Sequence, residues 1–202
     1  MSPSHILEPT YRAIKQRLMY GEWSAGSRLD TARLAADLGV STSPVRDSLN
    51  RLAGERMVDF EPGEGFHVPR LDEKGLQDLL DLNLHLLLAA IPGDFAFPRI
   101  DTPAEDLAVR AAACFSRMAK ASGNGELYAA IAALNDRLAA VRRLDAAVLV
   151  EPTVELDALD QSLAAQAHPR SIRDTITSYH VVRKLHAAGF VRLLAIEATD
   201  LD

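Results

Sequence analysis

Apolar side chains recur at helical spacing near the start of the chain. Within residues 8–20, Tyr11, Ile14 and Leu18 repeat every three or four positions, while basic side chains occupy other faces. An apolar stripe of that period is typical of an amphipathic helix that buries one side. The sequence therefore predicts a first helix over residues 8–20.

A second, shorter helix is indicated by the residues that would begin and end it. Asp30 can accept hydrogen bonds from the free N–H groups of a first turn, and Gly39 can take the left-handed conformation that ends many helices. Between them, Leu34 and Leu38 lie four positions apart and share a face. We expect a helix over residues 31–38.

The third helix is expected to begin at Ser43 and Pro44. Serine caps free N–H groups, and proline is tolerated at the first helical position, where no donor is needed. Val45, Leu49 and Leu52 follow at the spacing of a buried stripe. The opposite face then presents polar side chains to a partner, namely Ser43, Arg46, Asp47 and Asn50.

A pair of short strands is predicted after the third helix. Residues 57–60 and 66–68 flank a run, 61–65, that contains one proline and two glycines. Short runs around such a turn are typical of a β-hairpin. Three helices followed by a hairpin, or wing, make a winged helix-turn-helix, in which the third helix enters the major groove of DNA.

No strand pattern recurs from Leu71 onward. Turn-forming residues divide this part of the chain into helices, at Pro92-Gly93, Thr102-Pro103, Ser122-Gly123-Asn124-Gly125, Glu151-Pro152 and His168-Pro169. We therefore predict a mainly α protein with two domains, a winged helix-turn-helix at residues 1–70 and an all-helical bundle of about six helices at residues 71–202. The second domain is expected to bind an effector and to dimerise.

Composition indicates a globular chain without a membrane partner. Of the 202 residues, 48% are hydrophobic and 25% are charged, which is ordinary for a soluble domain. The longest apolar run, Leu84–Ile91, is interrupted by His85 and is far shorter than a membrane span. We see no secretory signal and expect a cytoplasmic protein. The single cysteine, Cys114, is expected to be a buried structural thiol.

Charge is divided unevenly along the chain. The formal net charge is −6, yet residues 1–70 hold nine Lys or Arg and nine Asp or Glu. The acidic excess therefore lies entirely in the second domain. That domain is unsuited to bind a polyanion, so any contact with DNA is expected in the first.

One string of residues points to a known family. Residues 38–52 read Leu-Gly-Val-Ser-Thr-Ser-Pro-Val-Arg-Asp-Ser-Leu-Asn-Arg-Leu and are followed by Met57-Val58 and a Pro-Gly-x-Gly-Phe wing. Over Tyr11–Val68 this pattern resembles the N-terminal domain of the GntR family of transcription regulators. The resemblance implies a metabolite-responsive regulator that binds double-stranded DNA at a palindromic operator as a homodimer.

The resemblance also implies which side chains contact DNA. Arg46 stands where two hydrogen bonds to a guanine edge can form, and Ser43 lies at a helix N-terminus, where a phosphate binds. Gly65 would let the wing approach the minor groove. The expected DNA-binding residues are Thr42, Ser43, Arg46, Asn50, Arg51 and Gly65.

Some positions depart from the family pattern. Thr42 and Ala32 stand where basic residues are common, and Glu61 and Glu64 occupy wing positions that are often Arg. Lost cations remove phosphate partners and carboxylates add repulsion, so we expect low affinity and a shallow dependence on salt. The alternative is a protein-interaction module that keeps the winged fold with little DNA affinity. The retention of Arg46 favours DNA binding.

The second domain resembles, more weakly, the helical effector domain of the FadR-like branch, which holds a metal ion through one Asp and three His. Here those positions carry Ala112, Ser116 and Leu156, the last beside Glu155, and only His180 remains. One imidazole does not build a metal site, so we expect no metal and no cofactor, and an effector that is more apolar than usual or none. The expected effector pocket comprises Asn83, His85, Ser116 and His180.

Other features of the second domain suggest no further chemistry. The chain has neither a phosphate loop nor a Gly-x-Ser-x-Gly elbow, so an enzyme is not expected. Arg142, Arg143 and Asp145 are interpreted as a solvated helix face. The apolar stripe over residues 79–88 exceeds what one buried helix face needs and is expected to contribute to a dimer interface.

Overall fold

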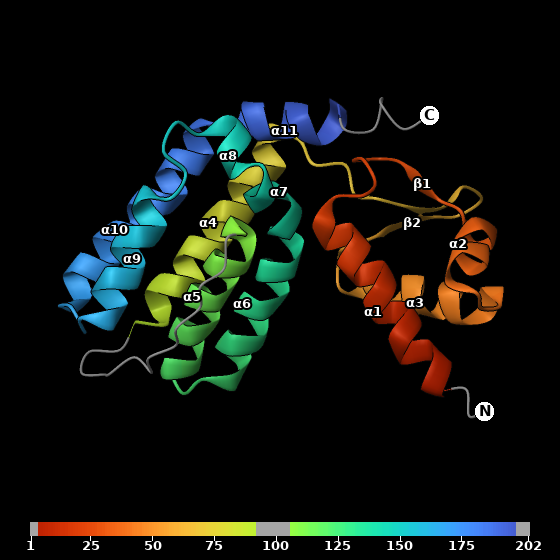
Figure 1. The fold of residues 1–202 in the computed structure, drawn as a ribbon, viewed down its shortest axis with the longest axis horizontal. Coiled ribbons are helices and arrows are strands. Elements are labelled where there is room, and N and C mark those ends of the chain that lie inside the picture. The colour runs from red at the N-terminus through yellow and green to blue at the C-terminus, as the bar shows by residue number, and fades with distance from the viewer. Residues whose placement is uncertain (1–3, 92–105, 197–202) are drawn as a thin grey trace. The chain divides into compact units, whose positions relative to one another are not determined.

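The computed structural model describes residues 4–91 and 106–196. Contacts along the chain define two compact units, the N-terminal unit (Met1–Leu71 with Leu193–Asp202) and the helical unit (Asp72–Arg192). Their secondary structure confirms the predicted class, a winged helix-turn-helix followed by helices alone (Figure 1). The predicted breaks at Pro92-Gly93 and Thr102-Pro103 lie outside the described residues.

The N-terminal unit contains three helices and a small antiparallel sheet. The helices are α1 (Ser4–Tyr20), α2 (Thr31–Leu38) and α3 (Thr42–Gly54), and the strands are β1 (Arg28–Leu29), β2 (Asp59–Glu61) and β3 (Gly65–His67). The strand order is β1-β3-β2, so the predicted hairpin is confirmed and gains a third strand. The sequence did not predict β1, because a two-residue strand has no readable alternation.

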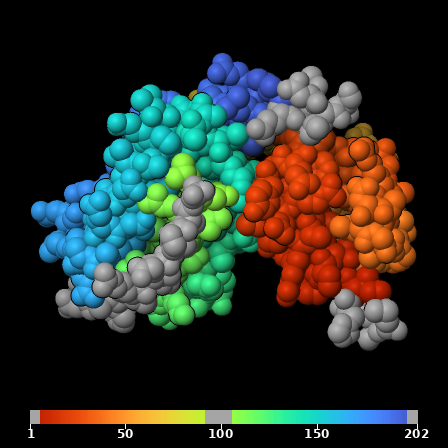
Figure 2. Space-filling model, in the orientation of Figure 1, coloured from red at the N-terminus to blue at the C-terminus, as the bar shows by residue number. Residues whose placement is uncertain are grey.

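The core of the N-terminal unit forms where α1 crosses α3. The side chains predicted to be buried, Ile14, Val45, Leu49 and Leu52, are each 0% exposed. Burying aliphatic side chains of this size stabilises a fold by roughly 1.5–3 kcal/mol each. Another side of α1 stays at the surface of the unit (Figure 2). Arg12 and Gln16 of this helix are exposed.

The ends of α2 are as predicted, whereas the start of α3 is not. The Asp30 carboxylate accepts hydrogen bonds from the backbone N–H groups of Ala32 and Arg33, and Gly39 ends α2 with a φ of 65°. The prediction that Ser43 caps α3 is wrong, because the helix begins at Thr42 after Ser41. Pro44 is tolerated as the third helical residue, since first-turn N–H groups have no partner within the helix.

The N-cap residues of α2 and α3, Asp30 and Ser41, can be compared by replacing each with alanine. Replacing Asp30 with Ala removes hydrogen bonds of 2.7 and 3.0 Å, so we expect the free energy of unfolding to fall by about 0.5–2 kcal/mol. Ser41 makes no capping hydrogen bond through its side chain, so Ser41→Ala is expected to stay within about 0.5 kcal/mol. Urea denaturation followed by circular dichroism measures both, and equal losses would contradict the assignment.

The helical unit is a bundle of α4–α10 with most of α11. The bounds are α4 (Glu73–Ala89), α5 (Leu107–Ala121), α6 (Gly125–Arg137), α7 (Ala139–Arg143), α8 (Asp145–Val148), α9 (Val154–Ala164), α10 (Pro169–Leu185) and α11 (Ala187–Ile196). In the packing, α4 lies against α6 and α10, α5 against α6 and α9, and α9 against α10 (Figure 1). The last residues of α11, from Leu193 onward, group with the N-terminal unit.

The described residues of the second domain contain eight helical segments, where the sequence predicted about six. The extra divisions fall at Leu138 and Leu144, which keep right-handed helical conformations. Neither position carries glycine or proline, so the breaks between α6, α7 and α8 leave no signal in the sequence. None of the described helices is both long and apolar enough to span a bilayer.

Two predictions about individual side chains of the helical unit have opposite outcomes. Cys114 is buried, as expected, and its Sγ donates to Asp160 Oδ1 at 2.7 Å, while burial raises the pKa of the thiol. The interpretation of Arg142 and Asp145 as a solvated helix face is wrong, because they are 2% and 0% exposed. These charges face the interior of the bundle.

Candidate functional site

A hollow of about 520 Å³ opens between α3 and the strands of the N-terminal unit. Arg46 and Asn50 line it from α3, and Gly65 lines it from β3. Three of the predicted DNA-binding residues, which lie up to nineteen positions apart in the sequence, therefore share one concave surface. The remaining lining residues are Arg28, Leu29, Asp30, Thr31, Phe60 and Phe66.

Arg46 is available to a partner. Its side chain is exposed and makes no ion pair with any described residue. Thr42 and Ser43 are exposed in the first turn of the same helix, where N–H groups without helical acceptors attract a phosphate. Asn50 follows Arg46 by one turn on the same face. This side of α3 offers donors to both phosphates and base edges.

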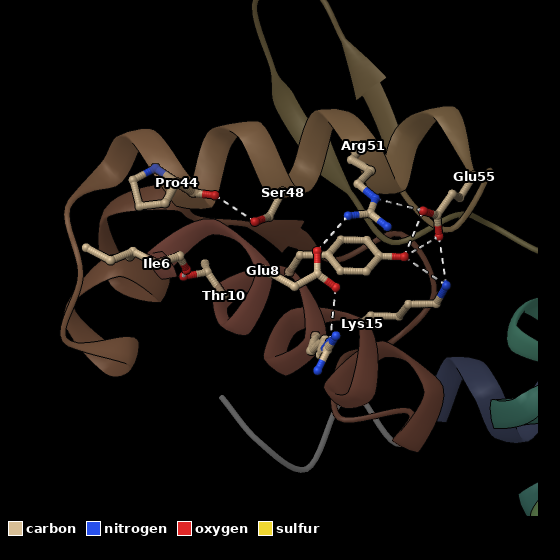
Figure 3. A network of polar contacts seen from close by, with 10 residues as sticks. Ile6, Glu8, Thr10, Lys15, Pro44, Ser48, Arg51 and Glu55 are labelled. Carbon is tan, nitrogen blue, oxygen red and sulfur yellow. Dashed lines mark hydrogen bonds and ion pairs between the residues drawn. The ribbon is translucent and has the colours of Figure 1, made fainter. Parts of the chain in front are cut away.

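Arg51, another residue predicted to contact DNA, is engaged elsewhere. Its guanidinium donates to Glu8 at 3.0 Å, lies 3.3 Å from a Glu55 oxygen and stacks 3.6 Å from the centre of the Tyr11 ring. Figure 3 shows Arg51 between Glu8 of α1 and Glu55, with Lys15 completing the network. Arg51 thus fastens α3 to α1, and it does not line the hollow.

The carboxylates of this network are held in their charged forms. Hydrogen bonds from Arg51 and Arg12 lower the pKa of Glu8. Burial raises the pKa of Glu55, but hydrogen bonds from Lys15 and Tyr11 outweigh it, so the net shift is downward. The positive charges of Arg12, Lys15 and Arg51 are therefore neutralised within the N-terminal unit.

Two cations without an ion pair among the described residues line the hollow. They are Arg28 and Arg46, and Arg33 is exposed on α2. Arg17 of α1, by contrast, is paired with Glu22 and Asp37. The lining of the hollow thus holds two cations and one carboxylate, Asp30.

The acidic side chains of the wing face away from this hollow. Strand residues alternate between the two faces of a sheet, so Phe60 faces the hollow while Asp59 and Glu61 face the opposite side. There, together with Glu64, they line a second hollow of about 450 Å³. The repulsion expected from Glu61 and Glu64 thus acts from the far face of the sheet.

Two lining residues were not among the predicted contacts. Arg28 of β1 pairs with His67 of β3, which places it on the same face of the sheet as Asp59, and it borders both hollows. Phe60 is 55% exposed, and its ring lies 5.0 Å from that of Phe66. The sequence could have indicated Phe60 as a contact, because it is a large aromatic residue on a short strand beside the turn. Nothing in the sequence indicated Arg28.

Three of the four predicted effector-pocket residues meet inside the helical unit. Asn83 Oδ1 lies 2.9 Å from His180 Nε2 and accepts from Arg142 Nη2 at 3.3 Å. Arg142 also donates to Asn135 at 2.9 Å, and Asn135 donates to Ser116 Oγ at 3.2 Å. We name these five residues, Asn83, Ser116, Asn135, Arg142 and His180, the interior cluster. The sequence did not predict Asn135 or Arg142 as members.

The fourth predicted pocket residue lies apart from the interior cluster. His85 is exposed on α4, and its Nδ1 lies 2.6 Å from the backbone oxygen of Asp81. Asn83 is fully buried on the same helix, because positions two apart on an α-helix point about 200° from each other. Nothing in the structure brings His85 to the cluster.

The residues at the positions implied for a metal do not fit one. Ala112 and Leu156 have no donor side chain, and Ser116 accepts from Asn135. His180, the remaining imidazole, has Nδ1 2.8 Å from the backbone oxygen of Ile176 and Nε2 directed at Asn83. Burial lowers its pKa to about 3, so it is neutral at physiological pH. Among the described residues, no three His, Cys, Asp or Glu are grouped as metal ligands.

Known sequences match this chain chiefly over its N-terminal unit. Residues 7–68 match the model of the family described as "Bacterial regulatory proteins, gntR family". The HTH-type transcriptional regulator McbR of Escherichia coli (strain K12) is 33% identical over 78 residues, which are 39% of this chain and 35% of McbR. An HTH-type regulator from an unstable DNA locus of Streptomyces ambofaciens is 29% identical over 161 residues, 71% of this chain and 68% of that protein.

Solved structures resemble the chain over nearly its whole length. E. coli McbR/YncC has a TM-score of 0.65 at 20% identity, with 98% of this chain and 99% of that chain covered. A GntR transcriptional regulator from Rhodococcus sp. RHA1 has a TM-score of 0.71 at 16% identity, with 91% and 97% covered. At these identities the likeness shows the fold, including the helical second domain.

Proposed function

From the GntR-type domain at residues 7–68, we propose that this chain is a transcription regulator that reads a specific DNA sequence through α3. The observation that supports this most is Arg46, exposed and without an ion pair among the described residues, in a hollow bounded by the wing. A winged helix places this face of its third helix in the major groove, where an arginine forms two hydrogen bonds to guanine O6 and N7.

The distribution of charge supports a DNA contact on this face rather than on α1. Arg28 and Arg46 line the hollow without an ion pair among the described residues, while Arg12, Lys15 and Arg17 of α1 have carboxylate partners. Each phosphate that a protein neutralises releases condensed counterions, which is the main source of affinity for the DNA backbone. We place the DNA-binding residues at Thr42, Ser43, Arg46, Asn50 and Gly65, with Arg28 added, and assign Arg51 to the junction of α1 and α3.

Selection of duplexes from a random pool by the full chain tests this function. We expect enrichment of one motif that contains a guanine at the position contacted by Arg46. If repeated rounds at low salt enrich no motif, the winged domain does not read sequence, and the protein-interaction module becomes the better description. The Arg46→Ala variant, carried through the same rounds, identifies enrichment that does not depend on α3.

Arg28 is expected to act as a phosphate contact. Replacing it with Ala removes one cation from the rim of the hollow, so affinity should fall by a similar factor for all sequences. The slope of log K against log salt concentration should become shallower by about 1. Fluorescence anisotropy over a salt series measures this slope. An unchanged slope would remove Arg28 from the interface.

We propose that the protein binds a palindromic operator as a homodimer. One winged helix reads a short half-site, and two-fold symmetry doubles the readout at sites about one helical turn apart. Leu82 of α4 and Val181 and Leu185 of α10 are 48%, 44% and 77% exposed, and α4 packs beside α10. We propose that these exposed apolar side chains contribute to the contact with a second copy. A monomer by light scattering at micromolar concentration would rule this arrangement out.

We also propose that the helical unit binds a small-molecule effector. The helical unit keeps several polar groups in its interior, and buried polar groups are retained only where they have partners or a use. Asn83, Ser116 and His180 remain our candidates for the effector site, and His85 is removed from it because it is exposed.

A further inference from the structure

A cation without a carboxylate partner lies in the interior of the helical unit. Arg142 is 2% exposed and forms no ion pair within 4 Å with any described residue. The nearest fully buried carboxylate, Asp145, is hydrogen-bonded to Arg183 at 2.6 and 3.1 Å. Arg183 also lies 3.7 Å from Glu155. An isolated charge is costly to remove from water, so a bound anion beside the Arg142 guanidinium would stabilise the helical unit.

The groups that Arg142 contacts directly are neutral, while the nearby charges of Asp145 and Arg183 are paired with each other. Its guanidinium donates to the amide oxygens of Asn135 and Asn83 and lies 4.9 Å from the centre of the Phe115 ring. Amide oxygens and the face of an aromatic ring attract the guanidinium, but they carry no net negative charge to neutralise it. His180 adds no negative charge, since its buried imidazole is neutral.

The interior cluster also contains buried N–H donors that have no hydrogen-bond partner. Arg142 Nε and Asn83 Nδ2 are both buried and have no hydrogen-bond partner. Asn83 Oδ1 accepts from Arg142 and lies 2.9 Å from His180 Nε2, and the Tyr179 hydroxyl beside Arg142 is also buried without a partner. Buried polar groups are nearly always hydrogen-bonded, so two free donors beside a positive charge indicate a place for an oxygen acceptor.

The cluster stands where the family resemblance implies a metal ion, and the residues do not fit that metal. Through its contacts Arg142 of α7 joins α4, α5 and α6, and Asn83 extends the link to His180 of α10. The guanidinium therefore supplies a fixed positive charge where ligands for a metal are missing.

We propose that Arg142 replaces the metal as the cation of this interior site, and that it binds one small oxyanion, a carboxylate or a phosphate, with Asn83. This rests on the proposed function only in naming that anion as the effector. It also revises the expectation of an apolar effector, which considered the lost metal ligands but not Arg142.

The test compares the full wild-type chain with Asn83→Asp. In the variant a carboxylate replaces the amide whose Oδ1 is 3.3 Å from Arg142, and the unpartnered Nδ2 disappears. It supplies the missing charge from within the chain. Gln161→Glu, which makes the same chemical change at an exposed position of α9, is the control.

Thermal unfolding and isothermal titration calorimetry are measured with sodium acetate, succinate and phosphate, each against sodium chloride at equal ionic strength. We expect at least one of the three to bind wild type and Gln161→Glu with one site and to raise their melting temperature saturably. Asn83→Asp should bind at least tenfold more weakly and, without added anion, melt at a higher temperature than wild type. EDTA should change none of these values.

Absence of saturable binding for all three anions, a lower melting temperature or loss of folding in Asn83→Asp, or undiminished binding by that variant would each overturn the proposal. Anisotropy titration of the same preparations with the selected duplex reports on DNA binding separately. A wild type that binds the anion but no duplex would refute the regulator function and leave the anion site standing.

Discussion

Replacing Arg46 with Ala is expected to weaken binding to the selected duplex about 5- to 150-fold. The side chain lines the hollow between α3 and the wing and is exposed without an ion pair among the described residues, so the free protein loses no internal contact. A bidentate arginine–guanine contact contributes about 1–3 kcal/mol of discrimination, which corresponds to that range of Kd. The variant should also accept other bases at the contacted position, as titration of single-base variants of the duplex would reveal.

Arg12→Ala is the matched control for this experiment. It removes the same charge from the same unit, but Arg12 lies on α1 and pairs with Glu8, with 75% of its side chain exposed. We expect a change in Kd of less than about threefold, since exposed ion pairs contribute little and the proposed DNA contact lies on α3. Equal losses in Arg12→Ala and Arg46→Ala would mean that total charge, and not the α3 contact, determines affinity.

Asp145→Asn should cause the largest loss of stability. The carboxylate is fully buried and accepts two hydrogen bonds from Arg183, which is 1% exposed. The amide would leave the guanidinium buried without its main counterion, and arginine cannot shed its proton to escape. Removing one partner of a buried pair costs about 3–5 kcal/mol. Urea denaturation monitored by circular dichroism should show a clearly lower midpoint.

Asp157→Asn provides the comparison for that variant. Asp157 also pairs with an arginine, Arg110, but its side chain is 49% exposed and Asp160 shares the same partner. We expect a loss below about 1 kcal/mol, as for other solvated ion pairs. If both variants lost the same stability, the burial of Asp145 would have no energetic consequence.

Local chemistry explains what the sequence predicted well. Asp30 and Gly39 define α2 because a capping carboxylate and a left-handed glycine act over a few residues. The buried stripe of α3 and the turn of the wing are equally local. In each case the residues that determine the structure are neighbours in the chain.

Contacts between distant residues explain what the sequence did not predict. Arg51 appeared free to meet DNA, but Glu8, forty-three positions earlier, holds it against α1. Arg142 resembled a surface residue because Arg142-Arg143 and Asp145 read as a polar face, whereas its partner Asn83 is fifty-nine positions away. Charge pairing across a fold leaves no periodic pattern, so the interior cluster emerges only in three dimensions.

The measurement that tests the central claim most directly is an anisotropy titration of the wild-type chain with the selected duplex and with a duplex of the same composition in shuffled order. Specific complexes are typically at least about a thousandfold tighter than non-specific ones. We predict a difference of that order at physiological salt, reduced in Arg46→Ala. Equal affinity for the two duplexes would contradict sequence-specific recognition by α3.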